Sequence, residues 1–176
     1  RRSSRTSTDG SSRWLHHLLT ARGPVVYGRA MAVSASHEVT IEATPEEIMD
    51  VIADLAQTPV WSPQYTKAEV LDTYENGRPK QAKMTIKAAG MADDQILEYT
   101  WTDLTGSWVL IRSSSLKKQE AKYTLTPAGN KTKVKFEITV DPVVPIPGFL
   151  LKRSVSGGAE TATEGLKKFM AKNKKG

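Results

Sequence analysis

Residues 39–65 read VTIEATPEEIMDVIADLAQTPVWSPQY, and this stretch decides how the rest of the chain is interpreted. Its first residues alternate, because Val39 and Ile41 point to one side while the polar residues around them point to the other. Such alternation is typical of a strand with one buried face. The segment SHEVTIEA therefore predicts the first strand of a sheet.

A strongly signalled helix follows this strand directly. Thr44 is a good N-cap, Pro45 fits the first helical position, and Glu47 completes a capping box. Apolar residues then recur at helical spacing, at Ile48, Val51, Ile52 and Leu55. Pro59 and Pro63 are expected to end the helical region. A helix this short is expected to pack against a sheet rather than stand alone.

After Trp61 the hydrophobic pattern changes to a period of two. The alternating or apolar runs are QAKMTIKAAG (81–90), ILEYTWTD (96–103), SWVLIR (107–112), EAKYTLTP (120–127) and KVKFEITV (133–140). Turn signals such as ENGRP, LTGS and TPAGNKT separate these runs. Strands in series with short connections predict an antiparallel meander with one apolar face.

The C-terminal part predicts an extended, proline-rich segment followed by a long helix. The inward positions step by three or four residues, at Leu151, Val155, Ala159, Ala162, Leu166 and Phe169. The middle of this helix is unusually small, so Gly157 and Gly158 either mark a kink or leave space beneath the helix. The predicted order is a strand, a short helix region, six strands and a long helix. This is an α+β fold in which a curved sheet of about seven strands covers the last helix.

Composition excludes several classes of function. The chain has 176 residues and no cysteine, which rules out disulfides, thiolate catalysis and cysteine-based metal sites. No apolar run approaches the roughly 20 residues of a membrane span. Residues 31–176 carry a net charge of only +1, so a nucleic-acid partner is not expected.

The basic charge lies in the first 30 residues, which hold six Arg, no Lys and one acid, Asp9. This leader is rich in Ser and Arg. Three interpretations fit it: non-native sequence with Met31 as the natural start, a disordered native tail, or an organellar transit peptide. In each case residues 1–30 are expected to lie outside the folded domain, which is predicted to span residues 31–176.

Three segments carry a resemblance to a known family. They are VTIEATPEEIMDVIADLAQTPVW, YTLTPAGNKTKVKFEITVD and PIPGFLLKRSVSGGAETATEGLKKF. Together they resemble the START-like (SRPBCC, helix-grip) superfamily, and within it the polyketide cyclase/dehydrase and lipid transport family of actinobacterial type. The resemblance covers residues 31–176 and implies a helix-grip fold with a ligand cavity between the sheet and the last helix. It also implies that the Trp-Pro turn lies at the cavity mouth.

The side chains expected to line this cavity are Trp61, Met84, Ile86, Tyr99, Trp101, Trp108, Arg112, Tyr123, Phe136 and Phe149. Most are apolar, which suits a hydrophobic ligand. The alternative is that the same side chains fill a solid core, with Trp61 capping the helix layer. Arg112 shares its strand parity with Trp108, so it is the candidate to meet a polar group of a ligand; an exposed Arg112 is the alternative.

No catalytic constellation stands out in the predicted domain. His37 is interpreted as a structural residue at the edge of the first strand, and Glu98 shares parity with the outer face. An inward-facing carboxylate such as Glu120 would have a raised pKa and would suit general base catalysis. The glycine-containing segments lack the spacing of phosphate loops, and no metal-ligand cluster or cofactor site is predicted.

The sequence therefore favours a cytoplasmic, non-catalytic carrier or binder of a hydrophobic molecule such as a lipid, fatty acyl chain or polyketide-like compound. One alternative is a cyclase or dehydratase that uses an inward Arg or carboxylate. Another is a protein-interaction module of a bacterial stress system. The expected state is a monomer or homodimer. The basic C-terminal segment KKFMAKNKKG is interpreted as a solvated helix end, although it is also compatible with transient membrane contact.

Overall fold

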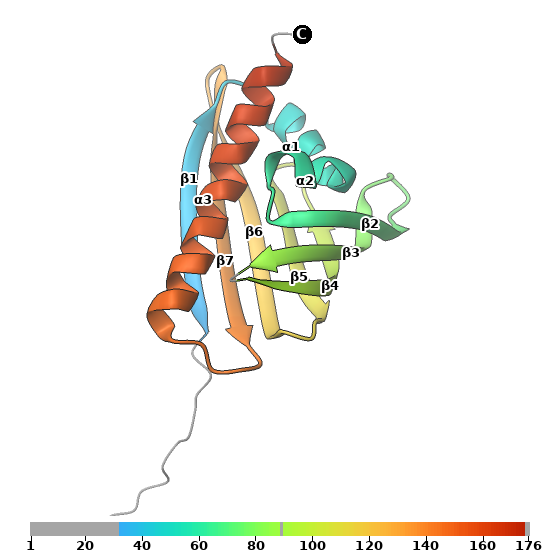
Figure 1. Cartoon of the computed structure of the whole chain (residues 1–176). Coiled ribbons are helices and arrows are strands. Elements are labelled where there is room, and N and C mark those ends of the chain that lie inside the picture. Colours follow the sequence, from blue (N-terminus) through green and yellow to red (C-terminus); the bar gives the residue numbers. More distant parts are fainter. Residues whose placement is uncertain (1–31, 89, 175–176) are drawn as a thin grey trace, which may run out of the picture.

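One antiparallel sheet of seven strands forms the frame of the protein (Figure 1). The structure is a computed structural model and describes residues 32–88 and 90–174. The predicted leader, residues 1–30, lies outside the described residues. The strands are β1 (Val33–Ile41), β2 (Tyr65–Thr73), β3 (Pro79–Ala88), β4 (Met91–Trp101), β5 (Thr105–Arg112), β6 (Leu116–Ala128) and β7 (Lys131–Pro142).

The strand order is β1-β7-β6-β5-β4-β3-β2. Consecutive strands from β2 to β7 are therefore neighbours, and β1 closes the sheet on the far side of β7. This arrangement confirms the predicted meander. Gly77 and Gly129 lie in the turns after β2 and β6 with φ of 83° and 67°, a backbone region that other residues rarely adopt.

The helices are α1 (Pro45–Ala53), the 3-10 turn η1 (Leu55–Gln57), α2 (Thr58–Trp61) and α3 (Gly148–Asn173). The predicted capping box is present, because the Thr44 side chain accepts from the Glu47 amide at 3.2 Å and the Glu47 carboxylate accepts from the Thr44 amide at 2.9 Å. Pro59 does not end the helical region as predicted. It lies in the first turn of α2, where a missing N–H breaks no helical hydrogen bond.

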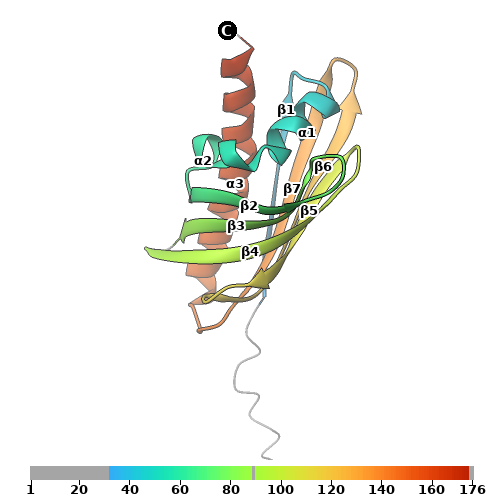
Figure 2. The same cartoon turned by 90° about the vertical axis from the view of Figure 1, so that its right-hand side faces the viewer.

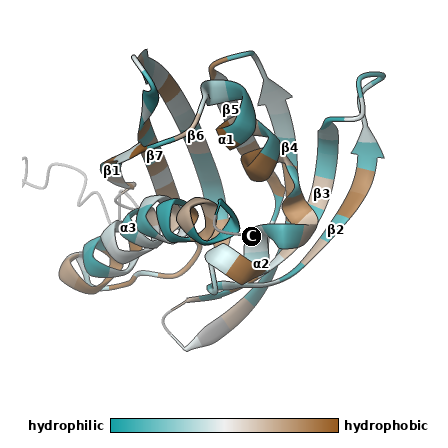
Figure 3. Cartoon of the chain, turned by 90° about the horizontal axis from the view of Figure 1, so that it is seen from above, coloured by the Kyte–Doolittle hydropathy of each residue, from teal (hydrophilic) through white to brown (hydrophobic). Residues whose placement is uncertain are grey.

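The sheet curves strongly, and the helices occupy its open side. Figures 1 and 2 show α3 running along the β1 and β7 half, while α1 and α2 lie toward the end of the molecule where α3 terminates. In the view from above, α2 and α3 lie on the concave side of the curved sheet (Figure 3). This arrangement is the predicted helix-grip fold.

Helix α3 is one continuous element, and its small residues have different surroundings. Its inward side chains are Leu151, Ala159, Ala162, Thr163, Leu166 and Met170. At Gly165 a Cβ atom would collide with the backbone carbonyl oxygen of Trp61, so α3 and α2 pack backbone to backbone there. At Gly157 a Cβ atom would meet nothing within 4 Å.

Candidate ligand-binding cavity

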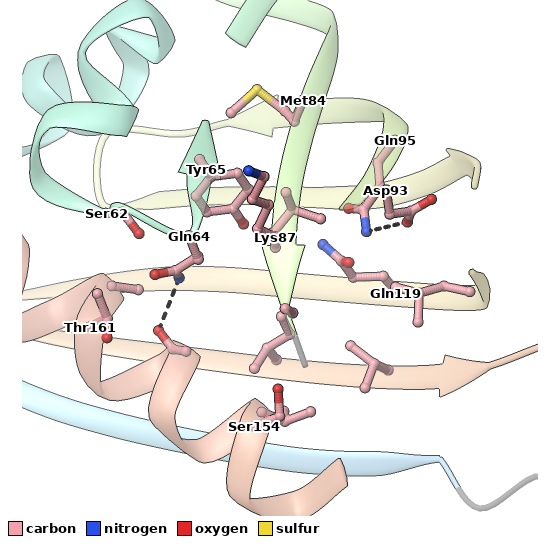
Figure 4. Close-up of a pocket in the computed structure, with 18 of the residues that line it drawn as sticks. Ser62, Gln64, Tyr65, Met84, Lys87, Asp93, Gln95, Gln119, Ser154 and Thr161 are labelled. Carbon is pink, nitrogen blue, oxygen red and sulfur yellow. Dashed lines mark hydrogen bonds between the residues drawn. The ribbon is translucent and has the colours of Figure 1, made fainter. Parts of the chain in front are cut away.

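A cavity of about 1150 Å³ lies between the concave face of the sheet, α2 and α3 (Figure 4). Pockets that bind drug-sized molecules have volumes of about 300–1,000 Å³, so this cavity has room for a larger ligand. The side chains of the packed apolar core therefore leave part of the space between the sheet and α3 unfilled. Side chains from β3, β4, β5, β6 and β7 form one wall, and those of α2 and α3 form the other.

Seven of the ten predicted residues line the cavity: Trp61, Met84, Ile86, Tyr99, Trp108, Tyr123 and Phe136. Their role in ligand binding remains a prediction. Four of them form an aromatic wall in which Trp108 is central. The Trp108 ring centroid lies 5.5 Å from that of Tyr99, 6.0 Å from that of Tyr123 and 5.7 Å from that of Phe136. Such separations are typical of favourable aromatic packing.

Trp101 lies outside the cavity, contrary to prediction. Its ring stacks on Tyr99 with centroids 5.6 Å apart, and its indole N–H donates to the Pro79 carbonyl oxygen at 2.7 Å. It also covers Gly106, where a Cβ atom would collide with the Trp101 ring. Trp101 shares the inward parity of Tyr99, but its contacts with Tyr99, Pro79 and Gly106 keep it away from the cavity.

Arg112 is also outside the cavity, because a bulge in β5 reverses its orientation. Trp108 is opposite Tyr99 and Leu110 is opposite Leu97, but Arg112 rather than Ile111 is opposite Ile96. The extra residue shifts the parity of the strand by one, since residues directly opposite each other in a sheet face the same side. The prediction that Arg112 shares the face of Trp108 is therefore wrong, and its side chain is exposed.

Phe149 is the third residue whose predicted place is wrong. It lies in the first turn of α3, and its side chain is 74% exposed. The inward neighbour Leu151 is two positions further on, which places Phe149 on a different side of the helix. Its neighbour Leu150 lines the cavity mouth, as do Val143 and Val144 from the loop before the helix.

A buried polar cluster in the cavity wall was missed by the sequence interpretation. Asp93 and Gln95 on β4 and Gln119 on β6 are 6%, 2% and 2% exposed, and all three line the cavity. The Gln95 amide donates to Asp93 Oδ2 at 3.0 Å. Ser113 Oγ donates to the same oxygen at 2.6 Å, and Ser114 Oγ donates to Asp93 Oδ1 at 3.0 Å.

The charge of Asp93 is stabilised by these donors. Burial raises the pKa of the Asp93 carboxyl, but hydrogen bonds from Ser113, Gln95 and Ser114 outweigh burial and hold this pKa below its usual value. The carboxylate is therefore ionised at neutral pH. The inward position of Asp93 and Gln95 could have been predicted from the sequence. Both residues occupy the same alternate positions of β4 as the buried Leu97 and Tyr99.

Buried polar atoms without a partner are concentrated at this cavity. Among the described residues, seven buried side-chain atoms lack a hydrogen bond. Six of them belong to residues that line the cavity: Thr58, Trp61, Ser62, Gln95, Trp108 and Gln119. Native proteins leave few buried polar atoms unpaired, so the polar side chains around this cavity are less completely paired than those elsewhere in the described residues.

Burial shifts the pKa values of three cavity tyrosines away from neutrality. Burial raises the pKa of the Tyr65 hydroxyl to about 12, so it remains a neutral phenol. Burial also raises the pKa of Tyr99 and of Tyr123 well above the usual value of a tyrosine. His37 pairs through Nδ1 with the Thr163 hydroxyl at 2.7 Å and joins β1 to α3. Glu98 and Glu120, weighed as inward carboxylates, are exposed.

The edge of the cavity between α3 and the start of β2 is held by one long hydrogen bond. The Gln64 side-chain amide, just before β2, donates to the Gly158 carbonyl oxygen at 3.5 Å (Figure 4). Both residues line the cavity. Gly157 and Gly158, near the middle of α3, both border the cavity. Of the two predictions for these residues, this agrees with the one in which they leave space beneath the helix.

Several solved structures share this fold. A START superfamily protein from Mycobacterium smegmatis is 22% identical, with a TM-score of 0.74 over 80% of this chain and 98% of that one. The Zhui aromatase/cyclase from Streptomyces sp. R1128 is 10% identical, with a TM-score of 0.70 over 81% of this chain and 96% of that one. At these identities the likeness is one of fold.

Comparison of the sequence with family models identifies a family, whereas the structural likeness identifies only the fold. A search among curated proteins gives no match. The model described as polyketide cyclase / dehydrase and lipid transport matches residues 32–171. This match spans most of the chain and includes the whole cavity. The chain therefore belongs to the polyketide cyclase/dehydrase and lipid transport family, within the START-like fold.

Proposed function

We propose that this protein binds and carries a hydrophobic small molecule, such as a lipid, a fatty acyl chain or a polyketide-like compound, in its central cavity. The observation that carries the proposal is the hollow, mostly apolar interior of about 1150 Å³. Burial of apolar ligand surface there is favourable by about 25 cal/mol per Å². We place the ligand-binding domain at residues 31–176, in line with the sequence prediction.

A cyclase or dehydratase activity has weaker support. General acid–base catalysis works best with a group whose pKa is near the working pH. In this cavity the pKa of Asp93 is held low by hydrogen bonds, and the pKa of Tyr65 is raised to about 12. Neither group is poised to exchange a proton near neutrality. The hollow interior likewise weighs against a pure protein-interaction module, for which a filled core was expected.

Identification of a bound molecule tests the proposal directly. The full chain would be purified from its natural host or a close surrogate, and its mass measured under native and denaturing conditions. We expect a stoichiometric mass difference from a hydrophobic molecule that organic solvent extracts. A protein that is empty and also fails to bind a neutral apolar fluorescent probe would contradict the carrier function.

The rim of the cavity supports transient contact with a membrane surface. Val143, Val144 and Leu150 line the mouth and are exposed, and Phe149 beside them is 74% exposed. Residues 142–159 contain no acidic residue and two basic ones, Lys152 and Arg153. Apolar side chains flanked by cations suit the interface of an anionic bilayer. No helix among the described residues is long and apolar enough to cross a membrane.

Replacing Phe149 by Glu is expected to weaken binding to vesicles of phosphatidylcholine and phosphatidylglycerol about tenfold or more, since a phenylalanine inserted in the interface contributes roughly 2 kcal/mol. Vesicle sedimentation measures this binding. Leu71→Glu, at an exposed apolar residue of β2 outside the cavity lining, is the matched control and should bind like the wild type. Equal losses in both variants, or none in either, would count against membrane contact at the mouth.

Cytoplasmic localisation, an actinobacterial source and a monomeric or homodimeric state remain predictions from the sequence.

A further inference from the structure

The first residues of β4 extend past the end of β5, and one side chain joins them to the loop that follows β5. The pairing of β4 with β5 ends at Ile96 and Arg112. Among the described residues, every hydrogen bond between residues 91–95 and the loop of residues 113–115 goes to the Asp93 carboxylate. At this level of the sheet, Asp93 therefore takes the place of the backbone hydrogen bonds that join neighbouring strands elsewhere.

The Asp93 carboxylate holds this loop with three hydrogen bonds. Its Oδ2 accepts from Ser113 Oγ at 2.6 Å, and its Oδ1 accepts from Ser114 Oγ at 3.0 Å and from the Ser114 amide at 3.3 Å. Ser113 Oγ in turn accepts from the amides of Ser115 and Leu116 at 3.0 Å and 2.9 Å. Hydrogen bonds to an ionised carboxylate are about twice as strong as neutral ones, so the loop is firmly attached to a buried residue of β4.

The loop is itself bonded to the segment between β7 and α3. The Ser115 carbonyl oxygen accepts from the Val143 amide at 2.9 Å. Residues 114–116 line the cavity, and so do Val143 and Val144. Asp93 is thus linked to two segments of the cavity wall that come from different parts of the chain.

We propose that Asp93 is a positioning residue that keeps two anchored segments, residues 113–116 and 143–144, in place in the cavity wall and so slows the release of a bound ligand. Asp93 acts through the serine loop, so it needs no contact with the ligand. The edge between Gln64 and Gly158 is held by one hydrogen bond of 3.5 Å, and the anchor confines exchange to that weaker edge. This inference rests on the proposed function and concerns the regulation of the same cavity.

Replacing Asp93 by Leu tests this inference, because leucine has nearly the same shape but accepts no hydrogen bond. The full chain is loaded with the neutral dye N-phenyl-1-naphthylamine, and stopped-flow dilution measures the rate of dye dissociation. We expect Asp93→Leu to release the dye about tenfold faster than the wild type, since three anchoring hydrogen bonds are lost.

Replacing Ser113 by Ala tests the same anchor from its other end. Ser113 does not line the cavity, so this change weakens the anchor without altering the surface that the dye contacts. Ser113→Ala should release the dye about threefold faster than the wild type. It also decides the matter if Asp93→Leu does not fold.

Hydrogen exchange of backbone amides shows whether the effect is local. The amides of Ser114, Leu116 and Val143 are bonded to Asp93, to Ser113 and to Ser115, so all three belong to the anchor. They should exchange about tenfold faster in Asp93→Leu. Amides in the ladder between β1 and β7 should exchange as in the wild type, because the anchor is not part of that ladder.

Thr132→Val is the matched control for a general loss of stability. Thr132 lies at the start of β7, at the opposite end of this strand from Val143, and its buried hydroxyl donates to the Ala43 carbonyl oxygen at 2.7 Å. Loss of this bond should lower the midpoint of thermal unfolding. It should leave the rate of dye dissociation and the exchange of the three amides unchanged.

The outcomes separate the anchor from the function on which it rests. Dye release that is unchanged in Asp93→Leu and in Ser113→Ala would overturn the role of Asp93 alone, whether or not the three amides exchange faster. Dye release accelerated equally by Thr132→Val would show that release follows global stability, and would also overturn this role. If the wild type fails to bind the dye, the carrier function is contradicted, and Asp93 loses its role in release with it.

Discussion

Replacing Gly165 by Ala is expected to destabilise the fold by about 2 kcal/mol or more, although alanine is the better helix former. A Cβ atom at this position would collide with the carbonyl oxygen of Trp61. That neighbour is backbone, so no side-chain rotation relieves the collision and α2 must move away from α3. Urea unfolding followed by circular dichroism measures the loss as a lower midpoint.

The same substitution at Gly157 provides the matched control. A Cβ atom there meets nothing within 4 Å, so only the helix propensity changes. Gly157→Ala should therefore stabilise the protein by about 0.5–1 kcal/mol. Opposite signs at two glycines of one helix are the expected result. A stabilising effect at Gly165 would mean that α2 and α3 are not packed backbone to backbone.

Replacing Ile86 by Glu is expected to weaken the binding of a neutral apolar ligand about 30-fold or more. Ile86 is partly buried and lines the cavity from β3. A carboxylate at this position either loses its hydration against the ligand or draws water into the cavity, and either costs about 2 kcal/mol of binding free energy. Titration of the wild type and the variant with N-phenyl-1-naphthylamine measures the effect.

Ile111→Glu is the control for this change, because it makes the same substitution at the bulge of β5, where the side chain is 53% exposed. It should leave dye affinity unchanged. If Ile86→Glu remains folded and binds the dye as the wild type does, then the dye does not occupy the cavity described above and the carrier function loses its main support.

The sequence predicted the architecture well because each element carried its own local signal. The capping box at Thr44 and Glu47 placed the first helix, and alternation placed most of the strands. Strand β2 (Tyr65–Thr73) was the least defined, since most of its side chains are exposed and its pairing with β3 contains register shifts. Such a strand is specified by its neighbours more than by its own residues.

The candidate site was predicted less completely, because it depends on contacts between elements, which the residue pattern of a single element does not reveal. Arg112 was misplaced because a bulge is a property of the pairing of two strands and does not show in the alternation of one. Phe149 was misplaced because hydrophobicity predicts burial only on average. Asp93 and Gln95 were not predicted because polar residues are usually exposed, although their positions in the alternation of β4 place them on the inner face.

The unequal attachment of α3 has a consequence for the rate at which a ligand exchanges. Toward the β1 side, the helix is held by packing along the strand, by the His37–Thr163 pair and by the Tyr123 hydroxyl, which donates to the Ala162 carbonyl oxygen at 3.0 Å. At the level of Gly158, the described residues offer only the 3.5 Å bond from Gln64. Movement of the segment around Gln64 away from α3 breaks this one weak hydrogen bond and leaves the pairs that hold α3 to β1 and β6 intact. We therefore expect a ligand to enter and leave through local opening at this edge, without global unfolding of the protein.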